Sequence, residues 1–163
     1  MIVVVGHGPS IVGKGMGPWI DRQTVIRLKG APMPNPDDWG TRTDVISTTK
    51  QEYLGPVKAA EYWLFGPEAP GFRHPDVERW IVWFNQFRTK LHKRAKPSNG
   101  LCAIFAAVEF LKPKTIALIG FDSILRPDQN SGKWHDPNPP KWSHDQKAEN
   151  AALHQLGVEI VEC

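Results

Sequence analysis

The sequence predicts an α/β domain built around a mostly parallel sheet. Short runs rich in β-branched residues alternate with stretches of helical periodicity, as in chains whose parallel strands are joined by helices. Two of these runs, 2–5 and 115–120, are continuously apolar and lead into a glycine, which is typical of strands buried on both faces. The chain has 163 residues and shows neither a repeat nor a linker, so we expect a single domain over 1–163.

The other elements follow from the same patterns, taken in chain order. Each remaining strand is a short β-branched or aromatic run, and each helix has apolar residues at helical spacing. The expected strands are 2–5, 24–28, 44–47, 62–65, 115–120 and 158–161, and the expected helices are 51–60, 76–91, 100–111 and 143–156. The segment 125–142 is rich in Pro, Asp, Asn and Gly without periodicity, which predicts a long loop or lid.

Composition narrows the class of protein. No apolar run reaches the roughly 20 residues that span a bilayer, and the first residues lack the features of a signal peptide, so no membrane anchor is expected. The net charge of +3 is only mildly basic, and the basic cluster at 90–96 is interpreted as a solvated helix end, so nucleic acid is a weakly supported partner. Cys102 and Cys163 are too few for a disulfide framework or a cysteine metal site, which favours the cytoplasm.

The turn after the first strand is rich in glycine and runs from Gly6 to Gly15. The dinucleotide-binding fingerprint fails here because Ile11 stands where the third glycine belongs. The triphosphate-loop pattern fits from Gly8 to Lys14, but the next residue, Gly15, has no hydroxyl for magnesium. What remains is a turn at which the backbone can approach a ligand at the carboxyl edge of the sheet.

Three blocks of sequence follow one another in a specific order. The first continues from the glycine turn into VIRLKGAP at 25–32 and DWGTRT at 38–43; the second is PSNG at 97–100. The third is His144 followed by Glu149. In this order the blocks resemble the large, small and short C-terminal motifs of the eukaryotic-type sialyltransferases, glycosyltransferase family 29.

The resemblance implies a single Rossmann-like sheet, a variant of the GT-A fold. It also implies an inverting enzyme that transfers sialic acid or a related sugar from a CMP-activated donor to an acceptor hydroxyl, with no metal and no other cofactor. The acceptor stays open among a glycan, a lipid, a nucleobase and a small metabolite. Because the chain is much shorter than the animal enzymes and carries neither their anchor nor their cysteines, it resembles a minimal bacterial or phage member acting in the cytoplasm.

The resemblance further implies which residues form the site. The residues expected to bind the donor are Gly6, His7, Gly8, Lys29, Ser98, Asn99 and Gly100. His7 and Lys29 stand where the family usually has asparagines, one of which holds the nucleotide, so donor contacts are expected to differ in detail. His144 is expected to act as the general base, with Glu149 in the same motif and His135 against the donor phosphate.

The residues support parts of this assignment without the resemblance. Ser98 or Asn99 is predicted to cap the following helix and to leave free N–H groups around Gly100, as in an anion site or an ordinary capped core helix. A capping box at 143–146 places His144 in a first helical turn, where the helix dipole favours the neutral imidazole that a general base needs. Glu149 would lie on another side of that helix and is expected to support neighbouring backbone or an inner shell rather than meet the substrate.

Three alternatives remain open at this stage. The first is a CMP-binding module without transferase activity, because His7 and Lys29 alter two expected donor contacts. The second is a degenerate triphosphate-loop phosphatase or kinase fold. The third is a metal site formed by His135, Asp136 and His144, although their spacing fits no standard metal motif.

Overall fold

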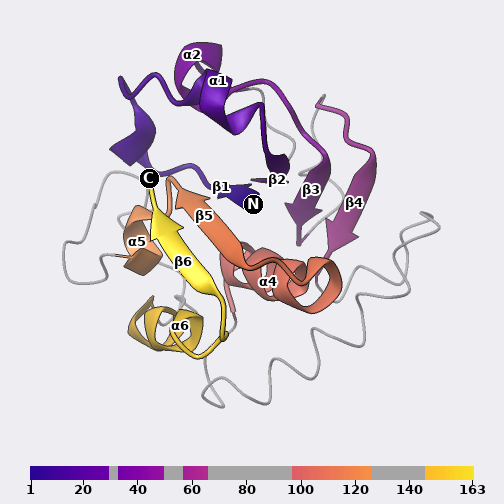
Figure 1. Cartoon of the computed structure of the whole chain (residues 1–163), viewed down its shortest axis with the longest axis vertical. Coiled ribbons are helices and arrows are strands. Elements are labelled where there is room, and N and C mark those ends of the chain that lie inside the picture. The colour runs from indigo at the N-terminus through magenta and orange to yellow at the C-terminus, as the bar shows by residue number, and fades with distance from the viewer. Residues whose placement is uncertain (30–32, 50–56, 66–96, 126–145) are drawn as a thin grey trace.

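The computed structural model describes residues 1–29, 33–49, 57–65, 97–125 and 146–163 (Figure 1). Within these residues one sheet has the strand order β4-β3-β2-β1-β5-β6, and every pairing is parallel. The strands are β1 (Ile2–Val5), β2 (Thr24–Leu28), β3 (Val45–Thr48), β4 (Glu61–Leu64), β5 (Thr115–Ile119) and β6 (Glu159–Glu162). This confirms the predicted α/β class with a single Rossmann-like sheet, and each strand lies within one residue of its expected position.

Both faces of the sheet are buried, as the continuous apolar runs predicted. Successive side chains of a strand point to opposite faces, so Ile2 and Val4 join one core cluster while Val3 and Val5 join the other. The same division holds along β5. This is why the central strands contain almost no polar residues, since neither face meets water.

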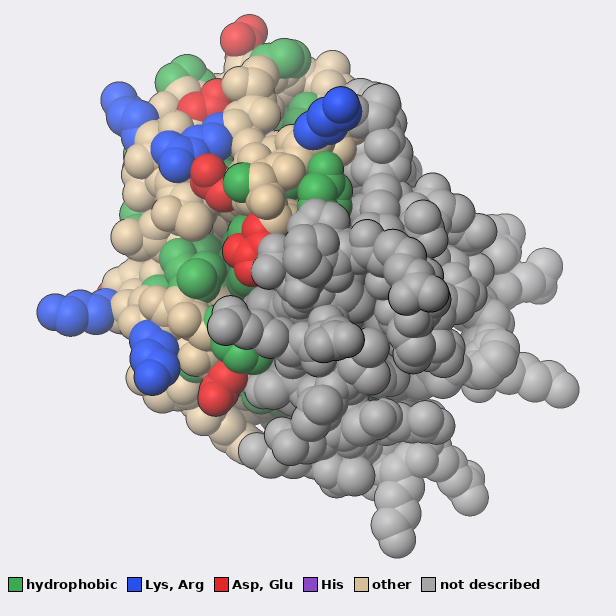
Figure 2. Space-filling model, turned by 90° about the vertical axis from the view of Figure 1, so that its right-hand side faces the viewer, with side chains coloured by type: hydrophobic (Ala, Val, Ile, Leu, Met, Phe, Trp, Pro, Cys, Tyr) green, Lys and Arg blue, Asp and Glu red, His purple; other side chains and the backbone are tan. Residues whose placement is uncertain are grey.

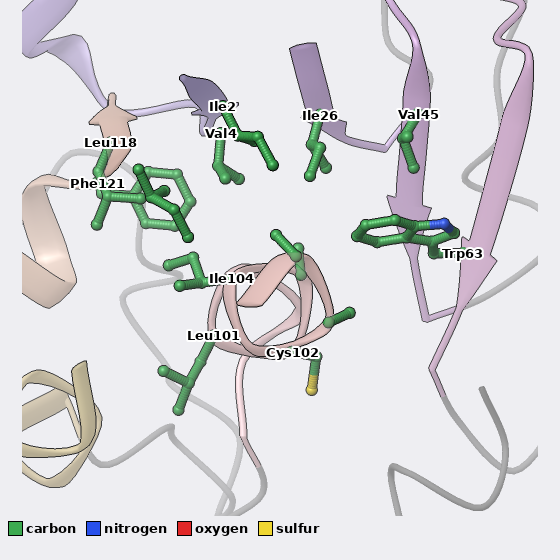
Figure 3. Packing of buried hydrophobic residues seen from close by; sticks show 14 of the residues in the cluster. Ile2, Val4, Ile26, Val45, Trp63, Leu101, Cys102, Ile104, Leu118 and Phe121 are labelled. Atoms are coloured by element: carbon green, nitrogen blue, oxygen red, sulfur yellow. The ribbon is translucent and has the colours of Figure 1, made fainter. Parts of the chain in front are cut away.

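Helices cover the two faces unequally (Figure 1). One face packs on the longer helices, α4 (Asn99–Ala106) and α6 (Gln146–Leu153), and on the short α5 (Asp122–Leu125). The opposite face packs on shorter pieces, η1 (Pro9–Ile11), α1 (Gly17–Ile20) and α2 (Pro36–Trp39). Figure 3 shows α4 lying under the central strands, with Trp63 of β4 at one side of the helix and Phe121 at the other.

The helix predictions hold less well than the strand predictions. The helix predicted at 100–111 is confirmed as α4 and its π-helical continuation η4 (Ala107–Leu111). The prediction of a helix at 51–60 is wrong for 57–60, which are not helical and lead directly into β4; the N–H of Ala59 donates to the Tyr62 hydroxyl at 3.2 Å rather than to a helical carbonyl.

Several predicted segments fall elsewhere. The last predicted helix ends at Leu153 rather than at 156, and Leu125, the predicted start of the loop, closes α5. The predictions for 51–56, 76–91, 126–142 and 143–145 lie outside the described residues.

The strand order places the point of reversal at β1. From β1 the chain moves through β2 and β3 to β4, and it then returns to the other side of β1 with β5 and β6. In open parallel sheets, ligands bind outside the carboxyl ends of the strands at such a reversal. The candidate site is therefore sought where β1 and β5 end. In the described part of the chain, no helix is long and apolar enough to cross a membrane.

Candidate functional site

The turns after β1 and β5 lie in direct contact. The backbone N–H of Gly6 donates to the carbonyl of Ile119 at 2.7 Å, and that of Gly8 donates to the carbonyl of Gly120 at 2.8 Å. A Cβ atom placed on Gly6 would lie 2.4 Å from the Gly120 carbonyl oxygen, closer than any side chain tolerates. Gly120 itself has a φ of +66°, which glycine adopts more readily than any residue with a Cβ. The close packing of two turns therefore explains these glycines.

The N-terminus of α4 reaches the same edge of the sheet. Of the two predicted capping residues, Ser98 is the N-cap, with the side-chain oxygen accepting from the N–H of Leu101 at 3.1 Å. The backbone N–H groups of Asn99 and Gly100 make no hydrogen bond within the described residues. Two uncompensated donors at a helix N-terminus can receive an anion, because the helix dipole adds to their own positive charge.

Glu149 of α6 holds this N-terminus in place. Its two carboxylate oxygens accept from the backbone N–H of Ser98 at 2.6 Å and from the Ser98 hydroxyl at 2.7 Å. The side chain is 2% exposed, so these bonds form away from bulk water and gain in strength. The expectation that Glu149 supports neighbouring backbone is confirmed by these bonds, and a role for it in catalysis stays a prediction.

Asn99 ties α4 to the sheet through a pair of hydrogen bonds to Ser47 of β3. Its amide nitrogen donates to the Ser47 carbonyl at 2.7 Å, and its amide oxygen accepts from the Ser47 hydroxyl at 2.9 Å. Ser47 is fully buried and was not predicted from the sequence. The signal available was a serine inside an otherwise apolar strand, which needs a partner when it is buried.

Phe121 joins the two glycine-bearing corners. A Cβ on Gly6 would lie 3.2 Å from one edge of its ring, and a Cβ on Gly100 would lie 2.7 Å from another. The Leu28 side chain lies 3.3 Å from the same Gly100 position. Segments far apart in the sequence thus meet at one edge, and Gly100 is a glycine because α4 packs closely on this ring.

His7 and Lys29 occupy the ends of β1 and β2. The His7 Nε2 atom is hydrogen-bonded to the Leu28 carbonyl, and burial lowers the pKa of the imidazole, aided by the charges of Lys29 and Arg27. Lys29 adopts a left-handed conformation with φ +64°, which is uncommon outside glycine, and its N–H donates to the Ser47 carbonyl at 2.8 Å. Strained residues of this kind occur often at functional sites.

Asp122 is a further polar residue at this edge that the sequence did not predict. Its carboxylate accepts from the backbone N–H of Ser10 at 3.2 Å, and it would lie 1.9 Å from a Cβ on Gly8. It follows directly after the apolar strand β5 and Phe121, which is a position where strand ends carry functional side chains. We call His7, Lys29, Ser98, Asn99 and Gly100, with Phe121 and Asp122, the carboxyl-edge site.

The first of the three sequence blocks, which runs on from the glycine turn to Thr43, binds its own backbone. Asp38 accepts from the backbone N–H groups of Gly13 and Gly15, at 2.8 Å each, and these bonds lower the pKa of its carboxyl group. A triphosphate loop would keep such N–H groups for phosphate. Here a carboxylate of the chain itself occupies them, which argues against the triphosphate-loop alternative.

Asp21 and Arg27 also bind backbone groups of this first block. Asp21 accepts from the backbone N–H groups of Thr41 and Arg42 at 2.8 Å each; burial opposes but does not cancel the lowering of its pKa by these bonds. Arg27 is buried and donates to the carbonyls of Trp39 and Arg42 at 3.0 and 2.9 Å. Burial lowers the pKa of Arg27 to about 10, so it stays charged at neutral pH. We call Asp21, Arg27 and Asp38, with the backbone they bind, the motif corner.

Other predicted residues are not placed. His135 and His144 lie outside the described residues, as do Asp136 and Ser143. Among the described residues, no three His, Cys, Asp or Glu side chains come together as metal ligands would. Comparison of the sequence with protein-family models and with curated proteins finds no match.

The described surface shows no strong clustering of charge on the face in Figure 2. Acidic and basic side chains are interspersed there rather than gathered by sign. The basic cluster at 90–96 lies outside the described residues. A nucleic-acid surface would need basic side chains on one face, and this view offers no support for one.

Proposed function

We propose that the chain is a glycosyltransferase that takes a sugar, such as sialic acid, from a CMP-activated donor and transfers it to an acceptor hydroxyl. The observation that carries the proposal is the contact of Phe121 with both Gly6 and Gly100. It brings two of the blocks that resemble sialyltransferase motifs to one edge, at the reversal of the strand order. The acceptor would be a glycan, a lipid, a nucleobase or a small metabolite.

The donor phosphate would bind at the N-terminus of α4. The N–H groups of Asn99 and Gly100 have no partner among the described residues, whereas those of Gly6 and Gly8 are bonded to the turn after β5. The same donors would stabilise the CMP phosphate as it leaves, an effect worth about 3–4 kcal/mol for a well-placed donor. The ammonium group of Lys29, at the end of β2, would add a positive charge without a metal.

The acceptor hydroxyl would be deprotonated by His144 as its oxygen attacks the anomeric carbon and the bond to the CMP phosphate breaks. General-base assistance of this kind is worth about 10²–10⁴ in rate. Glu149 links the helix after His144 to Ser98, so it would hold base and phosphate donors in one arrangement. His135 would contact the donor phosphate. Both cysteines are free thiols, in keeping with action in a reducing cytoplasm.

The test is the release of CMP from CMP-sialic acid, with and without candidate acceptors. The His144→Ala variant is expected to lose about 10²–10⁴ in turnover while still binding CMP. The matched control is His154→Ala, because His154 is an exposed histidine at the end of α6. Equal turnover by the wild type and the His144→Ala variant would remove His144 from the mechanism. If CMP is released from no CMP-sugar, the proposal that the chain is a glycosyltransferase is overturned.

A nucleotide-binding module without catalysis is the second candidate. It is favoured by His7, whose side chain is held by the Leu28 carbonyl, and by Lys29, since both replace expected donor contacts. Calorimetry with CMP and with other nucleotides separates the cases. Tight CMP binding without turnover of any CMP-sugar would establish this candidate, and turnover would exclude it.

A further inference from the structure

The imidazole of His7 is held in one tautomer. Its Nε2 atom lies in hydrogen-bonding contact with the carbonyl oxygen of Leu28, and a carbonyl oxygen can only accept. Nε2 therefore carries the hydrogen and donates it. In the neutral ring the other nitrogen, Nδ1, then has a lone pair and no hydrogen. The structure gives Nδ1 no hydrogen-bond partner among the described residues.

The ring stays neutral for identifiable reasons. His7 is partly buried, which disfavours the charged form and lowers the pKa, and the bond to Leu28 offsets only part of this effect. Two cations, Lys29 just after β2 and Arg27 on β2, act on the ring in the same direction as burial. On the β5 side the nearby turn carries Asp122, whose carboxylate is bonded to the N–H of Ser10.

Three backbone N–H groups of this turn already have partners. The N–H groups of Gly6 and Gly8 are bonded to the turn after β5, and that of Ser10 is bonded to Asp122. Within the described residues the Nδ1 atom of His7 has no hydrogen-bond partner, and His7 stands where the strand order reverses.

We infer that His7 is a specificity-determining residue whose Nδ1 atom accepts a hydrogen bond from an N–H or O–H group of the bound nucleotide. This rests on the proposed function to the extent that a nucleotide binds at the carboxyl-edge site. An asparagine side chain can turn either its N–H or its oxygen toward a ligand. His7 offers only a lone pair, so it selects for a ligand that presents a hydrogen. On CMP such groups are the ribose hydroxyls and the amino group of the base.

Two variants separate the ring nitrogens. Asparagine places its amide close to the position of Nδ1, whereas glutamine places its amide close to that of Nε2. His7→Asn is therefore expected to bind CMP within about twofold of the wild type, and His7→Gln about tenfold more weakly, as loss of one hydrogen bond predicts. Loss of affinity in neither variant, or an equal loss in both, overturns the inference.

The source of the hydrogen is identified with CMP analogues. We compare CMP with UMP, which lacks the amino group, and with 2′-deoxy-CMP and 3′-deoxy-CMP. One of these is expected to bind the wild type about tenfold more weakly than CMP, and this difference should disappear in His7→Gln. If each analogue loses affinity by the same factor in the wild type and in His7→Gln, His7 does not contact the group that the analogue lacks.

A measurement on the wild-type protein tests the inference even if a His7 variant fails to fold. Nitrogen-15 NMR of labelled histidines reports which ring nitrogen carries the hydrogen, with exposed His154 as the internal control. The Nε2–H form is expected in the free protein, and the His7 Nδ1 signal should move on addition of CMP while that of His154 stays. A CMP-saturated protein with an unmoved Nδ1 signal contradicts the inference and leaves the proposed function standing.

The two proposals fail in different ways. If CMP does not bind, but AMP, GMP or UMP binds and moves the Nδ1 signal, the role of His7 stands and the CMP-sugar proposal falls. If none of the four nucleotides binds, both are overturned.

Discussion

The motif corner and the carboxyl-edge site use the same kinds of groups in opposite ways. At the motif corner the charged side chains of Asp21, Arg27 and Asp38 are bonded to backbone groups of the same sequence block. At the carboxyl-edge site, side chains bond across the fold, and the N–H groups of Asn99 and Gly100 and one nitrogen of His7 remain without partners in the described residues.

This difference teaches how to interpret the sequence resemblance. The block that resembles the family most specifically forms a self-contained corner, whose bonds fix the loops between β1, β2 and β3. The groups without hydrogen-bond partners in the described residues come from the PSNG block and from His7 in the glycine turn. Substitutions at the motif corner should therefore reduce stability and spare binding, and those at the carboxyl-edge site should reduce binding.

The largest effect is expected from Arg27→Met. The substitution leaves the carbonyls of Trp39 and Arg42 without their donor inside the protein, at a cost of about 3–5 kcal/mol in the free energy of unfolding. Urea unfolding measures it, with exposed Arg22→Met as the control, which should change by less than about 0.5 kcal/mol. The protein that remains folded should bind CMP normally. A large loss of CMP affinity in Arg27→Met would contradict the expectation that the motif corner contributes to stability and not to binding.

Next comes Glu149→Gln, for which two physical effects predict opposite signs. Removing a negative charge beside the N-terminus of α4 would by itself tighten CMP binding. Weaker hydrogen bonds to Ser98 should leave the N–H groups that would bind the phosphate less well positioned. They should also reduce the free energy of unfolding by about 1.5–3 kcal/mol. We expect weaker CMP binding, measured by calorimetry, with Glu159→Gln on β6 as the control. Tighter binding would show that charge, not positioning, is the role of Glu149.

A smaller effect is expected at the pair formed by Asn99 and Ser47. Asn99→Ala should cost about 1–2 kcal/mol because it leaves the buried Ser47 hydroxyl without its acceptor, while the Ser47 carbonyl keeps the bond from the Lys29 N–H. Ser47→Ala and the double variant complete a cycle whose coupling energy should be at least about 0.5 kcal/mol. A coupling near zero would mean that α4 is held to β3 by apolar packing alone.

The smallest effect is the pH dependence of stability at His7. Its pKa is lowered in the folded protein, so the unfolded chain takes up a proton more readily. Stability is then complete above the ordinary pKa of about 6.5 and decreases as the pH falls below it. His7→Asn should show a shallower decrease below pH ~6.5 than the wild type in urea unfolding at a series of pH values. Parallel curves for the two proteins would contradict this.

Local signals in the sequence determined the sheet. Continuous apolar runs such as Ile2–Val5 and Thr115–Ile119 are removed from water only where both faces of the sheet are covered. The fold class and the positions of the strands could therefore be predicted from these runs. The Ser98 cap was predictable for the same reason, because its partner lies in the next turn of the chain. The helix predicted at 51–60 is wrong at 57–60, because these residues lead directly into β4, a pairing that local periodicity does not reveal.

The partners in the site were decided by the tertiary structure alone. Nothing local links Glu149 to Ser98, Asn99 to Ser47, or Phe121 to both Gly6 and Gly100, since these pairs meet only after the strand order reverses at β1. Burial and hydrogen bonds at such long-range contacts also set the tautomer of His7. The sequence alone determined which segments are buried because burial depends on the polarity of neighbouring residues, whereas which groups meet depends on how the whole chain is wound.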